Sequence, residues 1–234
     1  MKKWILFSAL SLTGLMSACN DDDSLNPVFI SDSAFETAAD GWVAQFSEYS
    51  TETDSTTFEM SASRTRLPFG LDTSKYAYRM QSHNRADDMF MYLKKKVTGF
   101  DPNKIYNVTF EVTLGTNYPE NSVGIGGSPG SSVYLKAGAS SVQPTRQIKD
   151  KMYEFNLDKG AQSQEGADAI ILGNVSNGDD KTVYKLAQKN SGSKTIAVKP
   201  NEAGEIWLFV GTDSGFEGLT ILYYDRIKVF LTAQ

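Results

Sequence analysis

The sequence predicts an all-β protein, folded as a two-sheet antiparallel β-sandwich, on three observations. The chain has 234 residues, enough for one such domain plus a targeting segment. Apolar and polar residues alternate in many short runs, as they do in strands with one buried and one wet face. Gly, Pro, Asn and Asp separate these runs, and no long segment has the periodicity of an amphipathic helix. We therefore expect many short strands and almost no helix.

Composition excludes several functional classes. Charged residues make up 22% of the chain and hydrophobic residues 40%, which is typical of a globular protein. The net charge is −5, and removing the leader lysines Lys2 and Lys3 leaves 21 basic against 28 acidic residues, or −7, which argues against nucleic-acid binding. One Cys and one His exclude a disulfide within the monomer and a zinc site built from several such ligands. Oxygen ligands remain, and they favour calcium or magnesium.

The N-terminus has the pattern of an export signal. Lys2 and Lys3 precede an apolar run, Trp4 to Met16, which is too short to span a bilayer as a helix. It ends in Met16-Ser17-Ala18-Cys19, which resembles a bacterial lipobox with Met where Leu is usual. This resemblance implies that Cys19 is lipidated and becomes the mature N-terminus. The alternative is an ordinary signal peptide cut nearby, with Cys19 left as a free thiol.

An acidic run, Asn20-Asp21-Asp22-Asp23-Ser24, follows Cys19 at once. It resembles the surface-export signal of lipoproteins in polysaccharide-degrading Gram-negative bacteria; the alternative is a solvated tether with no addressing role. We expect residues 1–18 to be a signal peptide, 19–27 a flexible tether and 28–234 a single β-sandwich domain. Such a protein is anchored to the outer membrane at the cell surface and does not span it.

The first half of the chain contains several candidate strands. Three short ones are Trp42 to Phe46, Phe58 to Ala62 and Tyr76 to Met80. Phe90 to Leu93 is a continuous apolar run, and Tyr106 to Leu114 alternates apolar with polar residues. The intervening segment contains charge, Gly and Pro, so we expect these two strands to form a hairpin. One hairpin buries too little surface to be stable alone, which requires a partner sheet.

Gly-rich connections separate the strands expected in the second half. The shorter candidates are Val133 to Ala137, Tyr153 to Leu157, Ala169 to Leu172 and Thr182 to Leu186. Ile206 to Val210 is apolar on both faces, which predicts a central strand. Thr220 to Leu231 predicts a long closing strand. Trp42 and Trp207 both lie in strand patterns, so we expect both indoles in the core.

Three short motifs resemble carbohydrate-binding modules with a galactose-binding-like jelly roll. Phe35-Glu36 followed by Gly41-Trp42 looks like their opening, and Val97 to Tyr106 is similar to their mid-domain turn. Leu222 to Val229 looks like their closing strand with its inward Asp. The resemblance implies a jelly-roll sandwich and a polysaccharide ligand. The Gly-rich region from Gly115 to Pro200 is longer than such modules usually need.

Asp225 is the candidate metal ligand of the closing strand. A period of two places it on the same face as Tyr223 and Ile227, among apolar neighbours. A buried carboxylate needs hydrogen bonds, a cation or a raised pKa. The resemblance implies a structural Ca2+ ion held by Glu36 and Asp225. The alternative is that Asp225 accepts hydrogen bonds from backbone amides at a bulge.

Aromatic rings in loops are candidates for sugar binding, because their flat faces stack on the C–H groups of pyranose rings. Tyr118 and Phe216 both lie in predicted loops. His83, Asp87 and Asp88 belong to the densest polar cluster before a core strand, where a His near a carboxylate could act as a general base. The alternative for this cluster is a solvated loop without a role.

Three functions therefore compete. The first is a non-catalytic surface lipoprotein that binds glycan or another envelope ligand. The second is a jelly-roll glycoside hydrolase or lyase, and the third is a structural adaptor of an envelope complex. The sequence contains no Glu-x-Asp-x-x-Glu pattern of the kind such hydrolases show, and its Gly-rich stretches lack the spacing of nucleotide-binding loops. The binding module is favoured over the enzyme.

Overall fold

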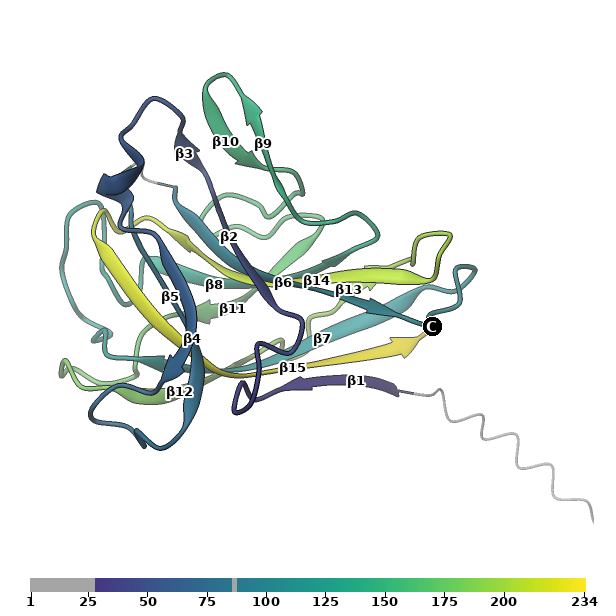
Figure 1. The fold of residues 1–234 in the computed structure, drawn as a ribbon, viewed down its shortest axis with the longest axis horizontal. Helices are drawn as coiled ribbons and strands as arrows, with labels where there is room; N and C mark the ends of the chain where they lie inside the picture. The colour runs from purple at the N-terminus through teal and green to yellow at the C-terminus, as the bar shows by residue number, and fades with distance from the viewer. Residues whose placement is uncertain (1–27, 86–87) are drawn as a thin grey trace, which may run out of the picture.

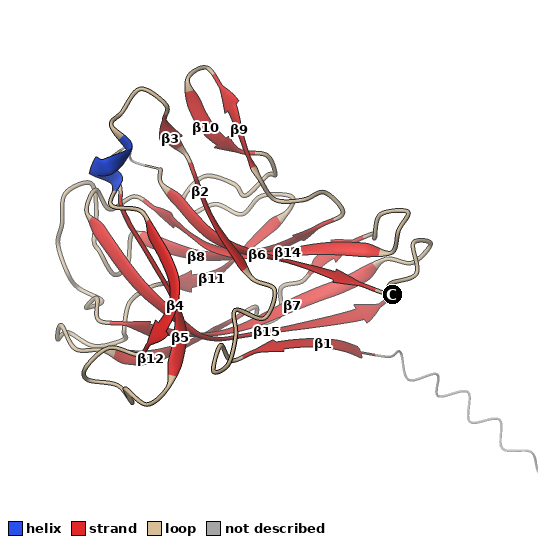
Figure 2. Ribbon diagram, viewed as in Figure 1, coloured by secondary structure: helices blue, strands red, loops and turns tan. Residues whose placement is uncertain are grey.

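The computed structural model describes residues 28–85 and 88–234, which form an antiparallel β-sandwich (Figures 1 and 2). In these residues the helical content is a single short 3-10 turn, Ser55–Phe58. The prediction of an all-β sandwich with almost no helix is confirmed. No helix of this part of the chain is long and apolar enough to cross a membrane.

The larger sheet has seven strands organised around its longest strand. Its members are β1 (Val28–Ser33), β4 (Ser61–Arg66), β5 (Tyr76–His83), β7 (Tyr106–Thr116), β12 (Lys185–Asn190), β13 (Ile196–Val198) and β15 (Leu219–Ala233). β15 pairs with β7 along one side, and with β5 and then β1 along the other. The long closing strand predicted from the sequence therefore runs through the middle of this sheet.

The second sheet has five strands in the order β11-β8-β14-β6-β2. Its members are β2 (Val43–Ser47), β6 (Phe90–Thr98), β8 (Val133–Ser140), β11 (Ala169–Asn174) and β14 (Glu205–Ser214). β14 is the central strand, as its apolar sequence predicts. A small third sheet, β3 (Tyr49–Ser50), β9 (Arg146–Lys149) and β10 (Met152–Phe155), projects from the sandwich (Figure 1).

The hairpin expected between residues 90 and 114 is wrong. β6 pairs with β2 and β14, whereas β7 pairs with β12, β13 and β15, so the two strands lie in different sheets. The connection crosses from one layer to the other, as connections do in a jelly roll. β6 also continues through Lys94, Lys95 and Lys96. The side chains of Lys94 and Lys96 point away from the core.

The core lies between the two large sheets and takes alternate residues from each strand. Ile206, Leu208 and Val210 of β14 belong to it. Trp42 is 2% exposed and packs in this core, as expected. Trp207 does not: it alternates with the inward residues, lies on the outer face and is only partly buried. The apolar run Ile206 to Val210 therefore has one face in the core, and on its other face Phe209 is buried and Trp207 only partly buried.

Candidate functional site

The outer face of the five-stranded sheet is half covered by the chain itself. Phe90, Tyr92 and Phe209 point outward from β6 and β14, yet each is 0% exposed. The ring of Phe155, from β10, packs on all three with centroid separations of 5.0, 4.8 and 5.2 Å. The small third sheet thus rests on one half of the outer face through a second aromatic cluster.

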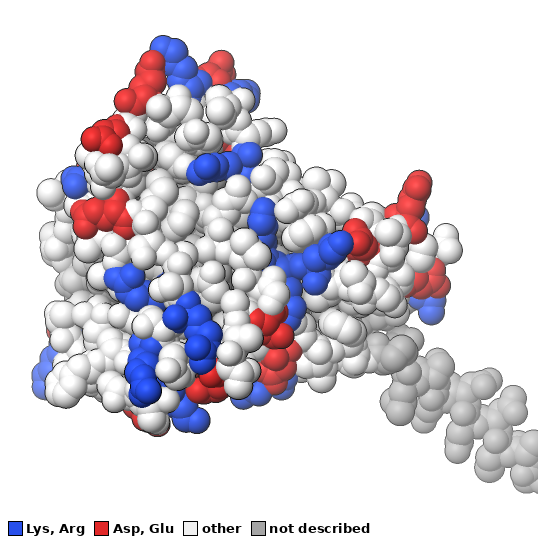
Figure 3. Space-filling model, in the orientation of Figure 1, with Lys and Arg blue, Asp and Glu red and all other residues white. Residues whose placement is uncertain are grey.

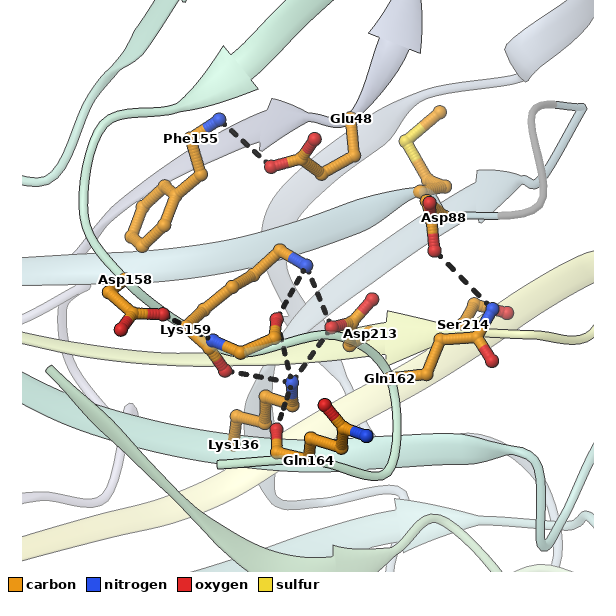
Figure 4. A network of polar contacts seen from close by, with 12 residues as sticks. Glu48, Asp88, Lys136, Phe155, Asp158, Lys159, Gln162, Gln164, Asp213 and Ser214 are labelled. Atoms are coloured by element: carbon orange, nitrogen blue, oxygen red, sulfur yellow. Dashed lines mark hydrogen bonds and ion pairs between the residues drawn. The ribbon is translucent and has the colours of Figure 1, made fainter. Parts of the chain in front are cut away.

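A buried charge network fixes the segment that follows β10 (Figure 4). Lys136 of β8 and Asp213 of β14 are 0% exposed, and Lys136 Nζ lies 2.9 Å from Asp213 Oδ2. Lys159 Nζ lies 2.8 Å from the same oxygen. Lys136 also donates to the main-chain oxygens of Lys159 and Gln164, at 2.8 and 3.0 Å. The network therefore ties residues 159–164 to the sheet beneath them.

Close backbone approach completes this cover. Gly138 lies beneath it, and a Cβ added there would stand 2.1 Å from the main-chain oxygen of Asp168 and 2.2 Å from Phe209 Cζ. Only glycine leaves room for the segment to lie this close to β8. Glu48 accepts a hydrogen bond from the Phe155 amide at 2.9 Å, and burial raises the pKa of its carboxyl group. These residues hold the cover against the sheet.

The other half of the outer face is more open: Val43 is 56% exposed and Trp207 is partly exposed, although Lys94 is buried at the border with the covered half. We call it the Trp207 face and define it by Val43 and Gln45 of β2, Lys94 and Lys96 of β6, and Trp207 of β14. Trp207 is opposite Lys96 in the strand register, and Lys96 Nζ lies 5.9 Å from the centre of its ring. Lys96 is also paired with Glu205, at 2.6 Å.

A pocket of about 340 Å3 lies at the border between the open and covered halves. Its lining comes from β2 and β6 on one side and from Arg146 of β9 on the other. Gln45 accepts hydrogen bonds from the Tyr92 hydroxyl and from Lys94 Nζ, at 2.9 and 2.7 Å, so its amide is held in one orientation. Trp207 does not line this pocket, and in the strand register Gln45 lies two strands away from it on the same outer face. A partly exposed indole and oriented polar groups on one sheet face suit a ligand with apolar faces and polar edges.

Sequence reasoning missed this site because it ended a strand too early. Treating Lys94 to Lys96 as part of a turn hid the alternation that places Lys94 and Lys96 on the outer face. If the strand is extended through the lysines, alternation places Lys96 on the outer face of the sheet. Alternation along β14 likewise places Trp207 on the outer face, away from the core. Neither pattern indicates which half of the face is covered, because the covering segment lies far away in the sequence.

The rings predicted to bind sugar from loops serve as packing instead. Tyr118 and Phe216 are partly buried and pack against the main core, so their expected exposure is wrong. The Tyr118 hydroxyl accepts from the Ile221 amide at 2.7 Å and donates to the Leu219 carbonyl at 3.2 Å. Phe216 is enclosed by glycines: a Cβ at Gly124 would lie 2.4 Å from its ring. The Gly-rich loop therefore lies against the ring, which is partly buried.

The described residues of the polar cluster, His83 and Asp88, have different partners. His83 Nδ1 lies 2.9 Å from Glu59 Oε1, at the end of β5. Asp88 is exposed and accepts a hydrogen bond from Gln162 at 3.3 Å, on the covering segment (Figure 4). Asp87 lies outside the described residues, as does the lipidation candidate Cys19.

Glu36 and Asp225 do come together. Both line a pocket of about 310 Å3 on the outer face of the seven-stranded sheet. Burial, and then the nearby charge of Glu36, raise the pKa of the Asp225 carboxyl group. Among the described residues no group of three or more His, Cys, Asp or Glu side chains could hold a metal ion, and Lys75 Nζ lies 3.9 Å from Glu36. A cation between the two carboxylates would need backbone oxygens or water as its other ligands.

The predicted phase of Asp225 is wrong. The pairing of β15 with β7 shifts between Tyr224 and Arg226, which is a β-bulge at Asp225. Tyr224 and Ile227 both point into the core, whereas Tyr223 lies on the other face and is only partly buried. Asp225 therefore lies at the bulge and not in an unbroken row with Ile227, and its side chain is half-buried rather than fully buried.

No protein-family model matches the chain, and no curated protein matches it. Among solved structures it is similar to the mannan-recognising carbohydrate-binding module TmCBM27, with 6% identity over 87% of this chain and 98% of that chain and a TM-score of 0.37. It is similar to the family 11 carbohydrate-binding module of the cellulosomal cellulase Lic26A-Cel5E of Clostridium thermocellum, with 10% identity, coverages of 90% and 97% and a TM-score of 0.37. It is also similar to the Stig cyclase Fisc from Fischerella sp. TAU, with 9% identity, coverages of 91% and 93% and a TM-score of 0.36. Function must therefore be argued from the side chains of this chain itself.

Proposed function

We propose that this protein is a non-catalytic glycan-binding module, anchored to the outer surface of a Gram-negative cell by a lipid on Cys19. The observation that carries the binding function is the position of Trp207. It is a large aromatic side chain on an open sheet face, beside Lys96 and outside the core. An indole kept partly exposed costs hydrophobic free energy that folding would otherwise recover, and a stacked ligand would recover it.

The surroundings of Trp207 support a sugar as the ligand. Sugars have an apolar face and a rim of hydroxyl groups, so they bind best to a ring flanked by oriented donors and acceptors. The Trp207 face presents an indole, an amide fixed by two hydrogen bonds and the Lys96–Glu205 pair. The opposite half, where a longer ligand could have continued, is filled by Phe155 and residues 159–164.

Anchoring and metal binding complete the proposal. The support for the lipid is the lipobox-like Met16-Ser17-Ala18-Cys19 after a short apolar run. The support for a structural calcium ion is the pair of carboxylates, Glu36 and Asp225, in one pocket. A cation there would stabilise the bulge of β15 and would take no part in sugar binding, because the pocket lies on the other sheet.

A glycan array followed by titration calorimetry tests the binding function. The secreted chain carrying Cys19→Ser is compared with the same chain carrying Trp207→Ala. Phe69→Ala is the matched control, because Phe69 is an aromatic residue that is 94% exposed at a loop far from the Trp207 face in sequence. We expect Trp207→Ala to weaken binding at least tenfold, or about 1.4 kcal/mol, and Phe69→Ala to leave it unchanged. Equal affinities for all three chains would place binding elsewhere, and an array without any bound glycan would favour the adaptor function.

A further inference from the structure

Lys94 is a buried cation without a counter-ion. Its residue is 8% exposed, and its ammonium donates to Gln45 Oε1 at 2.7 Å and to the main-chain oxygen of Pro144 at 2.6 Å. It makes no ion pair with any described residue. Burial lowers the pKa of this amine. A buried charge is normally paired, so a missing partner here is informative.

Arg146 is a second unpaired cation at the same pocket. It lies on β9, with its guanidinium carbon 4.4 Å from the centre of the Tyr153 ring, and it donates to the Tyr49 hydroxyl. No carboxylate of the described residues pairs with it. The neighbouring lysines differ, since each of them has an acidic partner: Lys95 with Asp40, Lys96 with Glu205 and Lys149 with Glu154.

The pocket between these two cations contains no acidic side chain. Its lining is Val43, Ala44, Gln45, Phe46, Lys94 and Arg146. The two charged residues of the lining are thus both basic, whereas Figure 3 shows basic and acidic side chains mixed over the face in view. This lining contrasts with the net charge of the whole chain, which is −5. The pocket is therefore a local positive site on an acidic protein.

The strand register gives the position of this positive site relative to the Trp207 indole. Lys96 is opposite Trp207, and Lys94 lies two residues further along β6, roughly 7 Å away along the strand. Trp207 does not line the pocket, so a glycan chain that stacks one ring on Trp207 would reach Lys94 and Arg146 with a substituent of a neighbouring ring. A guanidinium fork and an ammonium in a partly desolvated pocket bind a carboxylate or a sulfate through charge-assisted hydrogen bonds.

We infer that the Trp207 face selects acidic glycans, with the anionic substituent of a pyranose ring, a uronate carboxylate or a sulfate ester, bound between Lys94 and Arg146. The inference rests on the proposed glycan-binding function and specifies its ligand class. It assigns Trp207 to one ring and the cation pair to the charge on a neighbouring ring. An anion at the pair supplies the counter-ion that Lys94 lacks.

Matched polymers test the charge requirement. The Cys19→Ser chain is titrated with polygalacturonate, with the same polymer after full methyl esterification, with dextran sulfate and with dextran. Esterification removes the charge and keeps the sugar backbone. We expect at least tenfold tighter binding to an anionic polymer than to its neutral counterpart, and weaker binding as sodium chloride is raised. The two anionic polymers show whether a carboxylate or a sulfate is preferred, and preference for either supports the inference.

Matched variants test the position. Arg146→Gln and Lys94→Met should each weaken binding to the anionic polymer at least tenfold. Arg146→Gln should leave binding to the neutral form unchanged, whereas Lys94→Met also removes a hydrogen bond that holds Gln45. Lys149→Gln, on the same strand as Arg146 but paired with Glu154, should bind like the parent chain. Arg146 is exposed, so its variant is expected to fold even if Lys94→Met does not.

The outcomes separate this inference from the proposed function. Binding of neutral and anionic polymers with equal affinity, or loss of binding in Lys149→Gln as large as in Arg146→Gln, would overturn the acidic-glycan assignment. Trp207-dependent binding to neutral glycans alone would overturn it too and leave the glycan-binding function standing. If none of these polymers and no glycan of the array is bound, both are wrong.

Discussion

Asp213 is the residue on which the covered half of the outer face depends. It is fully buried between the ammonium groups of Lys136 and Lys159, at 2.9 and 2.8 Å. Asp213→Asn keeps the shape of the side chain but leaves two cations without a counter-ion in the protein interior. Removal of one partner from a buried ion pair costs about 3–5 kcal/mol. We expect a loss of this size in the free energy of unfolding, measured by urea denaturation.

The control for this variant is Glu52→Gln, which breaks the surface pair between Glu52 and Lys151. Both of its side chains are largely exposed, and such pairs contribute about 0–1 kcal/mol. A similar small loss in Asp213→Asn would mean that the buried network does not hold the covering segment in place.

Glu48 makes the free energy of unfolding depend on pH. Burial raises the pKa of its carboxyl group, and the folded state therefore binds the proton more tightly than the unfolded chain does. The ionised carboxylate of Glu48 therefore lowers the free energy of unfolding. This cost is fully present above the folded pKa and disappears as the pH falls toward 4.5, the ordinary pKa of the group. Glu48→Gln removes this cost, and the Gln oxygen can still accept from the Phe155 amide.

Thermal melts between pH 4 and pH 8 check this expectation. Glu48→Gln should melt at a higher temperature than the parent at pH 7.5, and the difference should shrink as the pH is lowered toward 4.5. A variant less stable than the parent at pH 7.5 would show that attraction to Lys159 outweighs the cost of burial.

At the scale of elements, the bulge of β15 brings Asp225 near Glu36. Two carboxylates in one pocket repel each other, and a calcium ion between them would relieve the repulsion. Binding to the folded state alone stabilises it by about 2.7 kcal/mol at a hundredfold excess over the dissociation constant. We therefore expect a higher melting temperature in calcium than in chelator, and Asp225→Asn should abolish the difference.

Asp101→Asn is the matched control for the calcium test, since Asp101 is an exposed acid in the connection between β6 and β7. It should keep the full calcium effect. Identical melts of the parent chain in calcium and in chelator, together with no metal in elemental analysis, would leave Lys75 as the group that offsets the charge of Glu36.

At the scale of the whole molecule, the proposed lipid on Cys19 would determine where the sandwich acts. β1 begins at Val28 and pairs antiparallel with the end of β15, so the described chain enters the domain beside its C-terminus (Figure 1). We expect Cys19→Ser to release a soluble, unlipidated protein from membrane fractions. Fractionation followed by mass spectrometry of the N-terminal peptide measures this. A variant that remains in the membrane fraction as firmly as the parent would exclude a lipid anchor.

The sequence by itself determined the class of fold and part of the core. Period-two alternation requires strands with one buried face, and that requirement holds whichever strands become neighbours. It was enough to predict a sandwich, the central position of Ile206 to Val210 and the burial of Trp42. The resemblance to carbohydrate-binding modules, and not periodicity, predicted that Glu36 and Asp225 lie together.

Only the tertiary structure decided which outer face is open and which side chains line it. A single bulge at Asp225 reverses the phase of a strand, and a strand that continues through three lysines turns Lys94 and Lys96 outward. Trp207 is left free, and Phe209 is covered, because Phe155 arrives from a distant segment and lies over one ring and not the other. Such contacts depend on the register between strands far apart in the chain, and no local pattern of residues encodes that register.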